Sequence, residues 1–529
     1  MTNTKEKILQ GNTSLGIELG STRIKAILID DQFETIAQGS FEWENQLVDG
    51  FWTYSLTDIW SGIQESYLSL ANEIQMKYAV TLEKIGSIGF SAMMHGYLAF
   101  DESDELLVPF RTWRNANTSQ AAKELSDLFQ YNIPERWSIA HLYQAVLDHE
   151  AHVNEIRYLT TLSGYIHWRL TGKKVLGVGD ASGMFPIDLA TNDFDQKKMA
   201  QFEEKISSDT LPWHLNDLLP KVLLAGENAG TLTQNGAKLL DLTGKLEAGI
   251  PLCPPEGDAG TGMIATNSVA KRTGNVSAGT SAFAMIVLEQ DLKTYYPEID
   301  LVTTPTGSLV AMVHTNNFSS EINSWMQLFQ QITDTFGLDV STGQLFDKLL
   351  TQALNGDADC GGLLLYGYHS GENITDIPEG RPLFVRTPKS TFNLANFMRL
   401  HIFSAFAALK IGMNILNQEQ VQIDRVVGHG GIFKTPVVAQ TVLAATMNAP
   451  VTVMENAGEG GAWGIAILAA FLNQSTKMSL TQFLDDYVFA NATGITLEAS
   501  ATDISGFNQF VERYQKGLPI EKSAIDYLI

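Results

Sequence analysis

The sequence predicts an α/β protein built from two domains. Its 529 residues exceed what one hydrophobic core usually encloses, and 44% of them are hydrophobic, which is enough for large buried cores. The two halves also open alike, because residues 15–28 and residues 274–287 each read as a strand, a glycine with two hydroxyl residues, and a second strand. We therefore expect one domain over residues 1–262 and another over residues 263–529.

The first half predicts a sheet with an antiparallel beginning. Apolar alternation and turn residues indicate strands at 14–19, 24–29 and 35–41, a helix at 56–78 and a buried strand at 85–90. Three strands, a helix and a strand differ from the strict alternation of a doubly wound nucleotide-binding sheet. The order therefore indicates another kind of α/β fold.

The second half repeats the opening hairpin and then alternates strands with helices. Strands are expected near 309–314, 425–427 and 451–454, and helices at 322–336, 397–416 and 436–447. The helix at 397–416 carries an apolar stripe typical of a helix that faces a core.

Composition excludes several classes of function. The formal charge of −24, from 35 Lys+Arg against 59 Asp+Glu, repels nucleic acid and anionic membranes, although such acidity also serves solubility alone. Cys253 and Cys360 lie in separate halves and imply no disulfide framework. The polar N-terminus does not read as a signal peptide, and no apolar run approaches the ~20 residues of a membrane span. We expect a cytoplasmic protein without nucleic-acid or membrane partners.

Two turns are candidate phosphate-binding sites. In the first, small residues let the backbone N–H groups approach an anion, while hydroxyl groups and Arg23 add donors. An isolated turn of this kind is more often only a hairpin, but its recurrence in the second half favours function. The residues of the two turns are Gly20, Ser21, Thr22 and Arg23, and Gly279, Thr280 and Ser281. Neither turn is a P-loop, since no Gly-Lys-Ser/Thr follows a spaced glycine.

Two carboxylates near these turns are candidates for chemistry. Asp258 stands between Gly257 and Ala259 in a Gly-rich segment, where it could accept the proton of an attacking hydroxyl group in phosphoryl transfer. Its structural alternative is an Asx-turn. Glu18 precedes the first turn and could hold Mg²⁺ through water, or could instead accept hydrogen bonds from nearby backbone amides.

Further candidates are individually weaker. His95, Trp113, Arg114 and Asp180 fall in turns where polar and aromatic groups could hold a polyol, although ordinary packing explains such residues more often. The glycines of residues 428–431, and those of residues 459–464, permit close approach to a flat ring such as adenine.

With these segments in place, the chain resembles the FGGY carbohydrate kinases of the actin-like, ribonuclease-H-like ATPase superfamily. The resemblance runs from about Ser14 to Ala470 and keeps the order of the family's motifs. It implies an interdomain active-site cleft, with the sugar site and first phosphate loop in residues 1–262 and the ATP site in residues 263–529. It also implies the following roles: Asp258 as catalytic base; Met94, His95, Trp113, Arg114 and Asp180 as sugar-binding residues; Gly20 to Arg23, Gly279, Thr280, Ser281, Gly430 and Gly431 as ATP-binding residues.

The chain resembles a bacterial branch of L-ribulokinases most, with D-xylulokinases close behind. Xylulokinases usually have Gln where Met93 stands, and the family usually has Asp at the positions of Glu18 and, often, Ala445. Arg114-Asn115 replaces a pair that commonly ends in Asp. None of these departures touches Asp258.

The resemblance therefore implies an ATP- and Mg²⁺-dependent kinase that phosphorylates the terminal hydroxyl group of a ketopentose, with L-ribulose as first candidate. D-xylulose, glycerol or gluconate as acceptor is one alternative. A sugar- and ATP-binding regulator without catalysis is another. A homodimer is plausible for such kinases.

Overall fold

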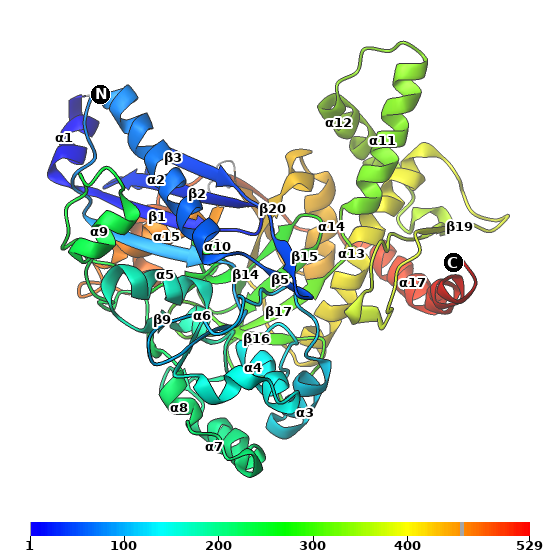
Figure 1. Ribbon diagram of the computed structural model, residues 1–529. Helices are drawn as coiled ribbons and strands as arrows, with labels where there is room; N and C mark the ends of the chain where they lie inside the picture. The colour runs from blue at the N-terminus through cyan, green and yellow to red at the C-terminus, as the bar shows by residue number, and fades with distance from the viewer. Residues whose placement is uncertain (1, 455–459, 529) are drawn as a thin grey trace. The chain divides into compact units, whose positions relative to one another are not determined.

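The computed structural model describes residues 2–454 and 460–528, and its contacts divide the chain into two compact units (Figure 1). The first unit comprises Met1–Val269, Leu301–Val310 and Gly458–Ala492, and the second comprises Ala270–Asp300, Ala311–Ala457 and Thr493–Ile529. The two-domain α/β fold is confirmed, whereas these units differ from a single division at residue 262, because later segments return to the first unit.

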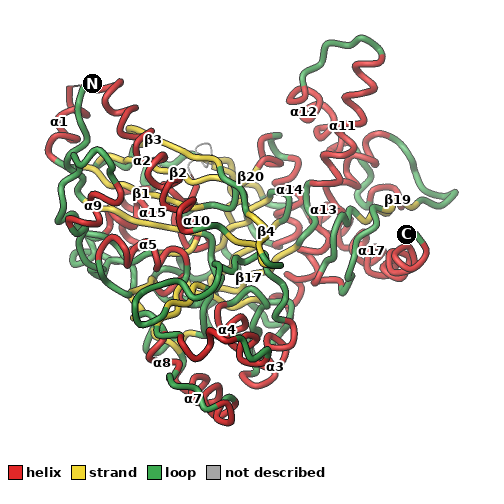
Figure 2. The backbone as a smooth tube through the Cα atoms, in the orientation of Figure 1, coloured by secondary structure: helices red, strands yellow, loops and turns green. Residues whose placement is uncertain are grey.

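The first unit is built on a five-stranded sheet of order β13-β6-β1-β2-β3 (Figures 1 and 2). Its strands are β1 (Thr13–Leu19), β2 (Arg23–Asp30), β3 (Thr35–Glu42), β6 (Ser87–Ala92) and β13 (Glu256–Gly257). β1, β2 and β3 pair antiparallel, whereas β6 is parallel to both β1 and β13. The predicted antiparallel beginning of an α/β sheet is confirmed.

Helices cover both faces of this sheet, and glycines mark where each helix lies closest. A Cβ on Gly39 of β3 would lie 2.0 Å from Ser66 O of α2 (Leu56–Tyr78), and a Cβ on Gly16 of β1 would lie 2.1 Å from Ala462 O of α15 (Gly460–Phe471). Gly16 pairs with Ile27 and Gly39 with Ala26, its neighbour on β2. Because successive residues of a strand face opposite sides, α2 and α15 cover opposite faces.

The first unit also contains smaller elements. They are α1 (Thr2–Gln10), β4 (Gln46–Val48), β5 (Phe51–Thr53), β7 (Leu98–Phe100), α3 (Ser119–Phe129), α4 (Ser138–Leu147), β8 (Tyr158–Thr160), α5 (Leu162–Thr171), β9 (Val175–Gly177), α6 (Val178–Ala181), β10 (Ile187–Asp188), β11 (Asp193–Phe194), α7 (Gln196–Lys205), α8 (Leu215–Leu218), β12 (Lys221–Leu223), α9 (Gln234–Leu240), α10 (Asp258–Ala265) and α16 (Leu480–Phe483).

The second unit repeats the pairing pattern of the first. Its main sheet contains the neighbouring strands β17-β15-β14-β20-β21-β22 in this order, and β16 precedes them at the edge next to β17. β14 is antiparallel to β15 and parallel to β20, which is parallel to β21. These strands are β14 (Thr273–Ala278), β15 (Ala282–Val287), β17 (Leu309–Thr315), β20 (Arg425–Gly430), β21 (Val451–Met454) and β22 (Gly494–Leu497). β16 (Asp300–Thr303) lies at the boundary of the units in sequence, and β18 (Leu364–Tyr366) pairs with β19 (Leu383–Val385). The similar openings predicted for the two halves are confirmed.

A long central helix organises the second unit. α13 (Leu394–Gln418) is long and apolar enough to cross a membrane, but 78% of its most apolar window is buried inside the protein, as expected of a core helix. It packs against α14 (Val438–Met447) and α17 (Ala501–Tyr527), the orange and red helices of Figure 1. Two further helices, α11 (Ser320–Thr335) and α12 (Thr342–Gln352), complete this part of the unit.

Because β1 and α15 lie so close together, a single methyl group added between them should destabilise the protein. We expect Gly16→Ala to lower the free energy of unfolding by about 1–3 kcal/mol, because its Cβ would collide with the backbone of Ala462 and Ala466. Chemical denaturation of the full chain followed by circular dichroism measures this change.

Gly262→Ala is the matched control in the same unit. A Cβ at Gly262, inside α10, meets no atom within 4 Å, so this change should leave stability unchanged or raise it by up to about 1 kcal/mol. Equal stability of the two variants would contradict the packing of α15 on β1.

Candidate functional site

Asp258 lies at the carboxyl edge of the parallel strands in the first unit. It begins α10 directly after β13, and its Oδ1 accepts hydrogen bonds from the backbone N–H groups of Met94 (3.1 Å) and Ala259 (3.0 Å). The side chain is exposed to solvent, yet the protein around it raises the pKa of the carboxyl group, and the two hydrogen bonds oppose that rise. Asp258 is therefore a reachable carboxylate that still has free lone pairs, as a general base requires.

Strand register brings Glu18 to the same edge. Glu18 of β1 is level with Ser91 of β6, which is level with Glu256 of β13. Burial raises the pKa of Glu18 to about 7, with a further contribution from the charge of Asp258. Two carboxylates that repel each other here would be stabilised by a nearby cation.

Glu18 fits a water-mediated magnesium ion better than a direct protein cage. Its Oε2 accepts a hydrogen bond from the N–H of Ala462 (3.2 Å), so part of the expected backbone alternative is present. Within residues 2–454 and 460–528, no group of three or more His, Cys, Asp or Glu residues could hold a metal ion. Mg²⁺ commonly keeps several waters and takes only one or two carboxylates, which matches this sparse donor set.

The first predicted phosphate turn is fixed through its carbonyl groups. Trp43 Nε1 donates to Gly20 O (2.8 Å), Tyr54 Oη to Ser21 O (2.5 Å) and Trp43 N to Thr22 O (3.2 Å). In the described part of the chain the N–H groups of Ser21 and Thr22 donate to no protein acceptor. The turn therefore keeps two backbone donors available to an anion.

Arg23 forms an exposed ion pair with Glu42 (2.8 Å), with side chains 57% and 78% accessible. Exposed pairs of this kind contribute little to stability, so an anion could replace Glu42 at small cost.

In the second unit, the predicted turn and the Gly430-Gly431 pair lie side by side. Ala278 at the end of β14 is in register with Gly430 at the end of β20. Gly430 has a φ of 122°, and a Cβ there would lie 2.1 Å from Ala278 O, so only glycine fits. The adjacent turn closes through Gly279 N and Ser281 O (2.9 Å) and leaves Gly279 and Thr280 exposed. Ala278 and Gly430, which are 152 residues apart in the sequence, thus meet at one edge of the sheet.

Met94 lies against the Gly257–Asp258 segment, and His95 follows it in the chain. A Cβ on Gly257 would be 2.1 Å from Met94 Cγ, which explains the glycine before Asp258. His95 is buried, its Nδ1 is 3.2 Å from Gly183 O, and its ring stacks on Trp137. Burial, followed by the charge of Arg136, lowers its pKa well below the usual value, so the imidazole is neutral.

Trp113 connects the predicted sugar-binding residues to the first phosphate turn. The indole is 38% exposed, and its Nε1 donates to Ser21 Oγ (3.2 Å). Arg114 lies 4.0 Å above the centre of the Trp52 ring, which is cation–π geometry. Both residues are accessible to a ligand in the first unit.

Asp180 is buried, as Met94 and His95 are, whereas Trp113 and Arg114 are exposed. Its Oδ2 accepts hydrogen bonds from Thr161 Oγ1 (2.7 Å) and Ser163 Oγ (2.5 Å), whereas Oδ1 has no partner among the described residues. Burial raises the pKa of Asp180 to about 7, and the charge of Asp258 adds to the rise. A sugar cannot reach this carboxylate directly in the structure, and its sugar-binding role stays a prediction.

Sequence reasoning missed Glu256, which is 1% exposed. Burial raises its pKa to about 8, with a further contribution from the charge of Asp180. A Glu two residues before Asp258, between Pro255 and Gly257, was the available signal, because charged residues rarely occupy such apolar, turn-rich segments without a partner.

The glycines predicted near an adenine ring divide between the units. Gly461 and Gly464 belong to the first unit, where Cβ atoms would lie 2.1 Å from Glu18 Oε1 and 2.2 Å from Thr261 O. Close packing of α15 therefore accounts for both residues. Glu459 of the same motif lies outside the described residues.

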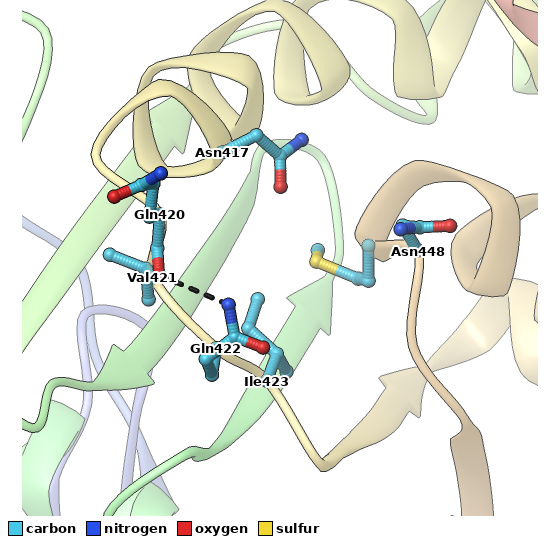
Figure 3. A pocket seen from close by; sticks show the side chains of 7 residues that line it. Asn417, Gln420, Val421, Gln422, Ile423 and Asn448 are labelled. Carbon is cyan, nitrogen blue, oxygen red and sulfur yellow. Dashed lines mark hydrogen bonds between the residues drawn. The ribbon is translucent and has the colours of Figure 1, made fainter.

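A cavity of about 480 Å³ in the second unit contains none of the predicted residues (Figure 3). It lies where α13 and α14 end, before β20 begins, at the opposite end of that strand from Gly430. Its lining residues are Asn417, Gln420, Val421, Gln422, Ile423, Met447 and Asn448. The cavity is thus separate from the glycine pair at the carboxyl edge.

Models of one protein family match both halves of the chain. The N-terminal domain model of the FGGY family of carbohydrate kinases matches residues 13–264, and its C-terminal domain model matches residues 274–472. A xylulose kinase of Haemophilus influenzae is 21% identical over 505 residues, covering 87% of this chain and 90% of that protein.

Solved structures share the fold. A ligand-bound xylulose kinase from Lactobacillus acidophilus has a TM-score of 0.77 at 16% identity, covering 97% of this chain and 99% of the other. A gluconate kinase from the same organism has a TM-score of 0.77 at 17% identity, covering 96% and 97%. Since the two family models together match most of the sequence, the chain belongs to the FGGY family of carbohydrate kinases.

Proposed function

We propose that this sugar kinase transfers the γ-phosphoryl group of ATP to the terminal C5 hydroxyl group of a ketopentose. The observation that carries the proposal is Asp258, a solvent-accessible carboxylate held by two backbone N–H groups at the carboxyl edge of the first sheet. In open α/β sheets, ligands bind at this edge.

In the proposed reaction, Asp258 accepts the proton of the sugar hydroxyl group as its oxygen attacks the γ-phosphate. The free amides of Ser21 and Thr22 and the guanidinium of Arg23 stabilise charge on the phosphoryl group. Gly279, Thr280 and Gly430 let the second unit's backbone approach ATP closely. When bound with ATP, Mg²⁺ supplies positive charge at the transferring group, and Glu18 would hold it through water.

We propose two candidate acceptors in order of preference. L-ribulose is our first candidate, because Met93 occupies the position where xylulokinases usually carry Gln. D-xylulose is the second, favoured by the xylulose kinases among the relatives. We propose further that the enzyme works in the cytoplasm, because its formal net charge is −24 and its two cysteines are free and buried.

Replacing the proposed base predicts a loss of turnover without a loss of nucleotide binding. We expect Asp258→Asn to lower kcat about 100- to 10,000-fold, because the amide cannot accept the hydroxyl proton. A coupled assay of sugar-dependent ADP release measures turnover, and calorimetry measures ATP binding, which should change less than about threefold.

Unchanged ADP release in Asp258→Asn would refute the role of Asp258. Sugar and ATP binding by the wild-type protein without any turnover would instead identify the non-catalytic regulator.

Activity measured over a panel of pentuloses, hexuloses and polyols identifies the acceptor. We expect kcat/KM for L-ribulose to exceed that for D-xylulose at least about tenfold, which corresponds to about 1.4 kcal/mol of discrimination. The reverse order would assign the chain to the D-xylulose alternative, and higher activity on glycerol or gluconate would contradict a ketopentose acceptor.

A further inference from the structure

Glu256 holds the first turn of α6 in the first unit. Its carboxylate accepts hydrogen bonds from the backbone N–H groups of Gly179 (3.3 Å) and Asp180 (3.0 Å). The adjoining segment is fixed as well, since Gly177 N donates to Pro255 O (2.8 Å). α6 has only four residues, too few to maintain its own geometry, so these external contacts define its position.

Two glycines fit the Glu256 side chain closely. A Cβ on Gly177 would lie 2.3 Å from Glu256 Oε1, and a Cβ on Gly179 would lie 2.4 Å from Oε2. Any larger residue at either position would displace the carboxylate. The segment before α6 is therefore shaped to receive this one side chain.

Asp180 links α6 to the Gly257–Asp258 segment. Hydroxyl groups of Thr161 and Ser163 fix its Oδ2, while its buried Oδ1 has no partner within the described chain. A Cβ on Gly257 would lie 3.2 Å from this free oxygen. Asp180 thus lies directly against the residue that precedes Asp258.

We propose that Glu256 is a positioning residue of the kinase reaction, which holds α6 and Asp180 against the Gly257–Asp258 segment and so fixes the direction of the Asp258 carboxylate. The inference rests on the proposed function of Asp258. Glu256 does not touch the substrate, because it is 1% exposed, and its carboxylate accepts hydrogen bonds from the backbone of α6 instead.

The electrostatics agree with this geometry. The charge of Asp180 on α6 raises the pKa of Glu256, and the charge of Glu256 raises the pKa of the Cys253 thiol before β13. The charge of Asp258 on α10 raises the pKa of Asp180 in turn. α5 also contacts β13, but its His167 bonds to Ala229 O instead. With a pKa raised to about 8, Glu256 is largely protonated at pH 7, which limits repulsion among three neighbouring carboxyl groups.

The test compares Glu256→Leu and Glu256→Gln in the full chain. Leucine removes the acceptor of two N–H groups, so we expect kcat to fall about 10- to 100-fold while KM for ATP stays within about twofold. Glutamine keeps an acceptor oxygen for only one of the two N–H groups, so kcat at pH 7 should be at least about threefold higher than in Glu256→Leu but need not reach that of the wild type. Activity is measured with whichever of L-ribulose and D-xylulose the wild type turns over.

Glu372 provides a matched control in the second unit. It is also buried, accepts hydrogen bonds from Asn316 N (2.9 Å) and Asn317 N (3.3 Å), and has a pKa raised to about 7, chiefly by burial. Glu372→Leu should lower the melting temperature as Glu256→Leu does. Its kcat at a temperature where it is folded should stay within about threefold of the wild type.

The pH profile separates positioning from simple stability. In the wild type, Glu256 ionises as the pH rises through about 8 and then repels Asp180, so kcat should decline. Because Glu256→Gln cannot ionise, the ratio of its kcat to that of the wild type should rise at least about threefold from pH 7 to pH 9. The same ratio for Glu372→Gln should not change.

Hydrogen exchange tests, independently of activity, whether Glu256 holds α6 in place. The amides of residues 177–183 should exchange at least about tenfold faster in Glu256→Leu than in the wild type, and by a smaller factor in Glu256→Gln, which keeps one acceptor oxygen. Unchanged exchange, or an unchanged kcat in folded Glu256→Leu, would overturn the proposal. If Glu256→Leu does not fold, the proposal would be overturned by a ratio of the kcat of Glu256→Gln to that of the wild type that stays constant between pH 7 and pH 9. A wild type that phosphorylates no sugar would contradict the proposed function, while exchange would still show whether Glu256 holds α6.

Discussion

The register of three parallel strands determines the chemistry of the first unit. Glu18, Ser91 and Glu256 are level on β1, β6 and β13, and one residue later each strand ends or turns. This alignment places the first phosphate turn, the Met94 amide and Asp258 at a common edge. A shift of one residue in β13 would reverse the faces of Glu256 and Gly257 and remove Asp258 from the Met94 amide.

Several carboxyl groups lie close together at that edge, and the surrounding structure limits the free-energy cost of burying them. Glu18, Asp180 and Glu256 are largely enclosed by protein, so each would lose much hydration energy as an ion. Backbone amides and hydroxyl groups replace part of that hydration, and proton binding relieves the remainder. Asp258 keeps contact with solvent and two N–H donors, which distinguishes it from the other three carboxyl groups and agrees with its proposed role as proton acceptor.

Local patterns predicted much of this arrangement. The paired turns, the antiparallel opening strands and the Gly-Asp segment all follow from residues close together in sequence. The return of α15 to the first sheet could not be predicted this way, since Glu18 and Ala462 are 444 residues apart. α15 is apolar on every side, so its periodicity does not show which sheet it covers. Glu256 was missed for the same reason, because its partners lie 76 and 77 residues away.

The repeated strand pattern carries different side chains in the two units, and this difference supports different roles. Glu18 corresponds to Ser277 when the two turns are aligned, and Ser277 is in register with His429 rather than with another hydroxyl residue. The edge in the second unit therefore lacks the carboxylates of the first among these aligned positions, and Gly430 brings two backbones together there. Backbone N–H groups without nearby carboxylates favour a polyanion, whereas a carboxylate-rich edge favours proton transfer from a hydroxyl group. The equivalent strand ends of one repeated fold thus differ in charge, which agrees with the different roles proposed for them.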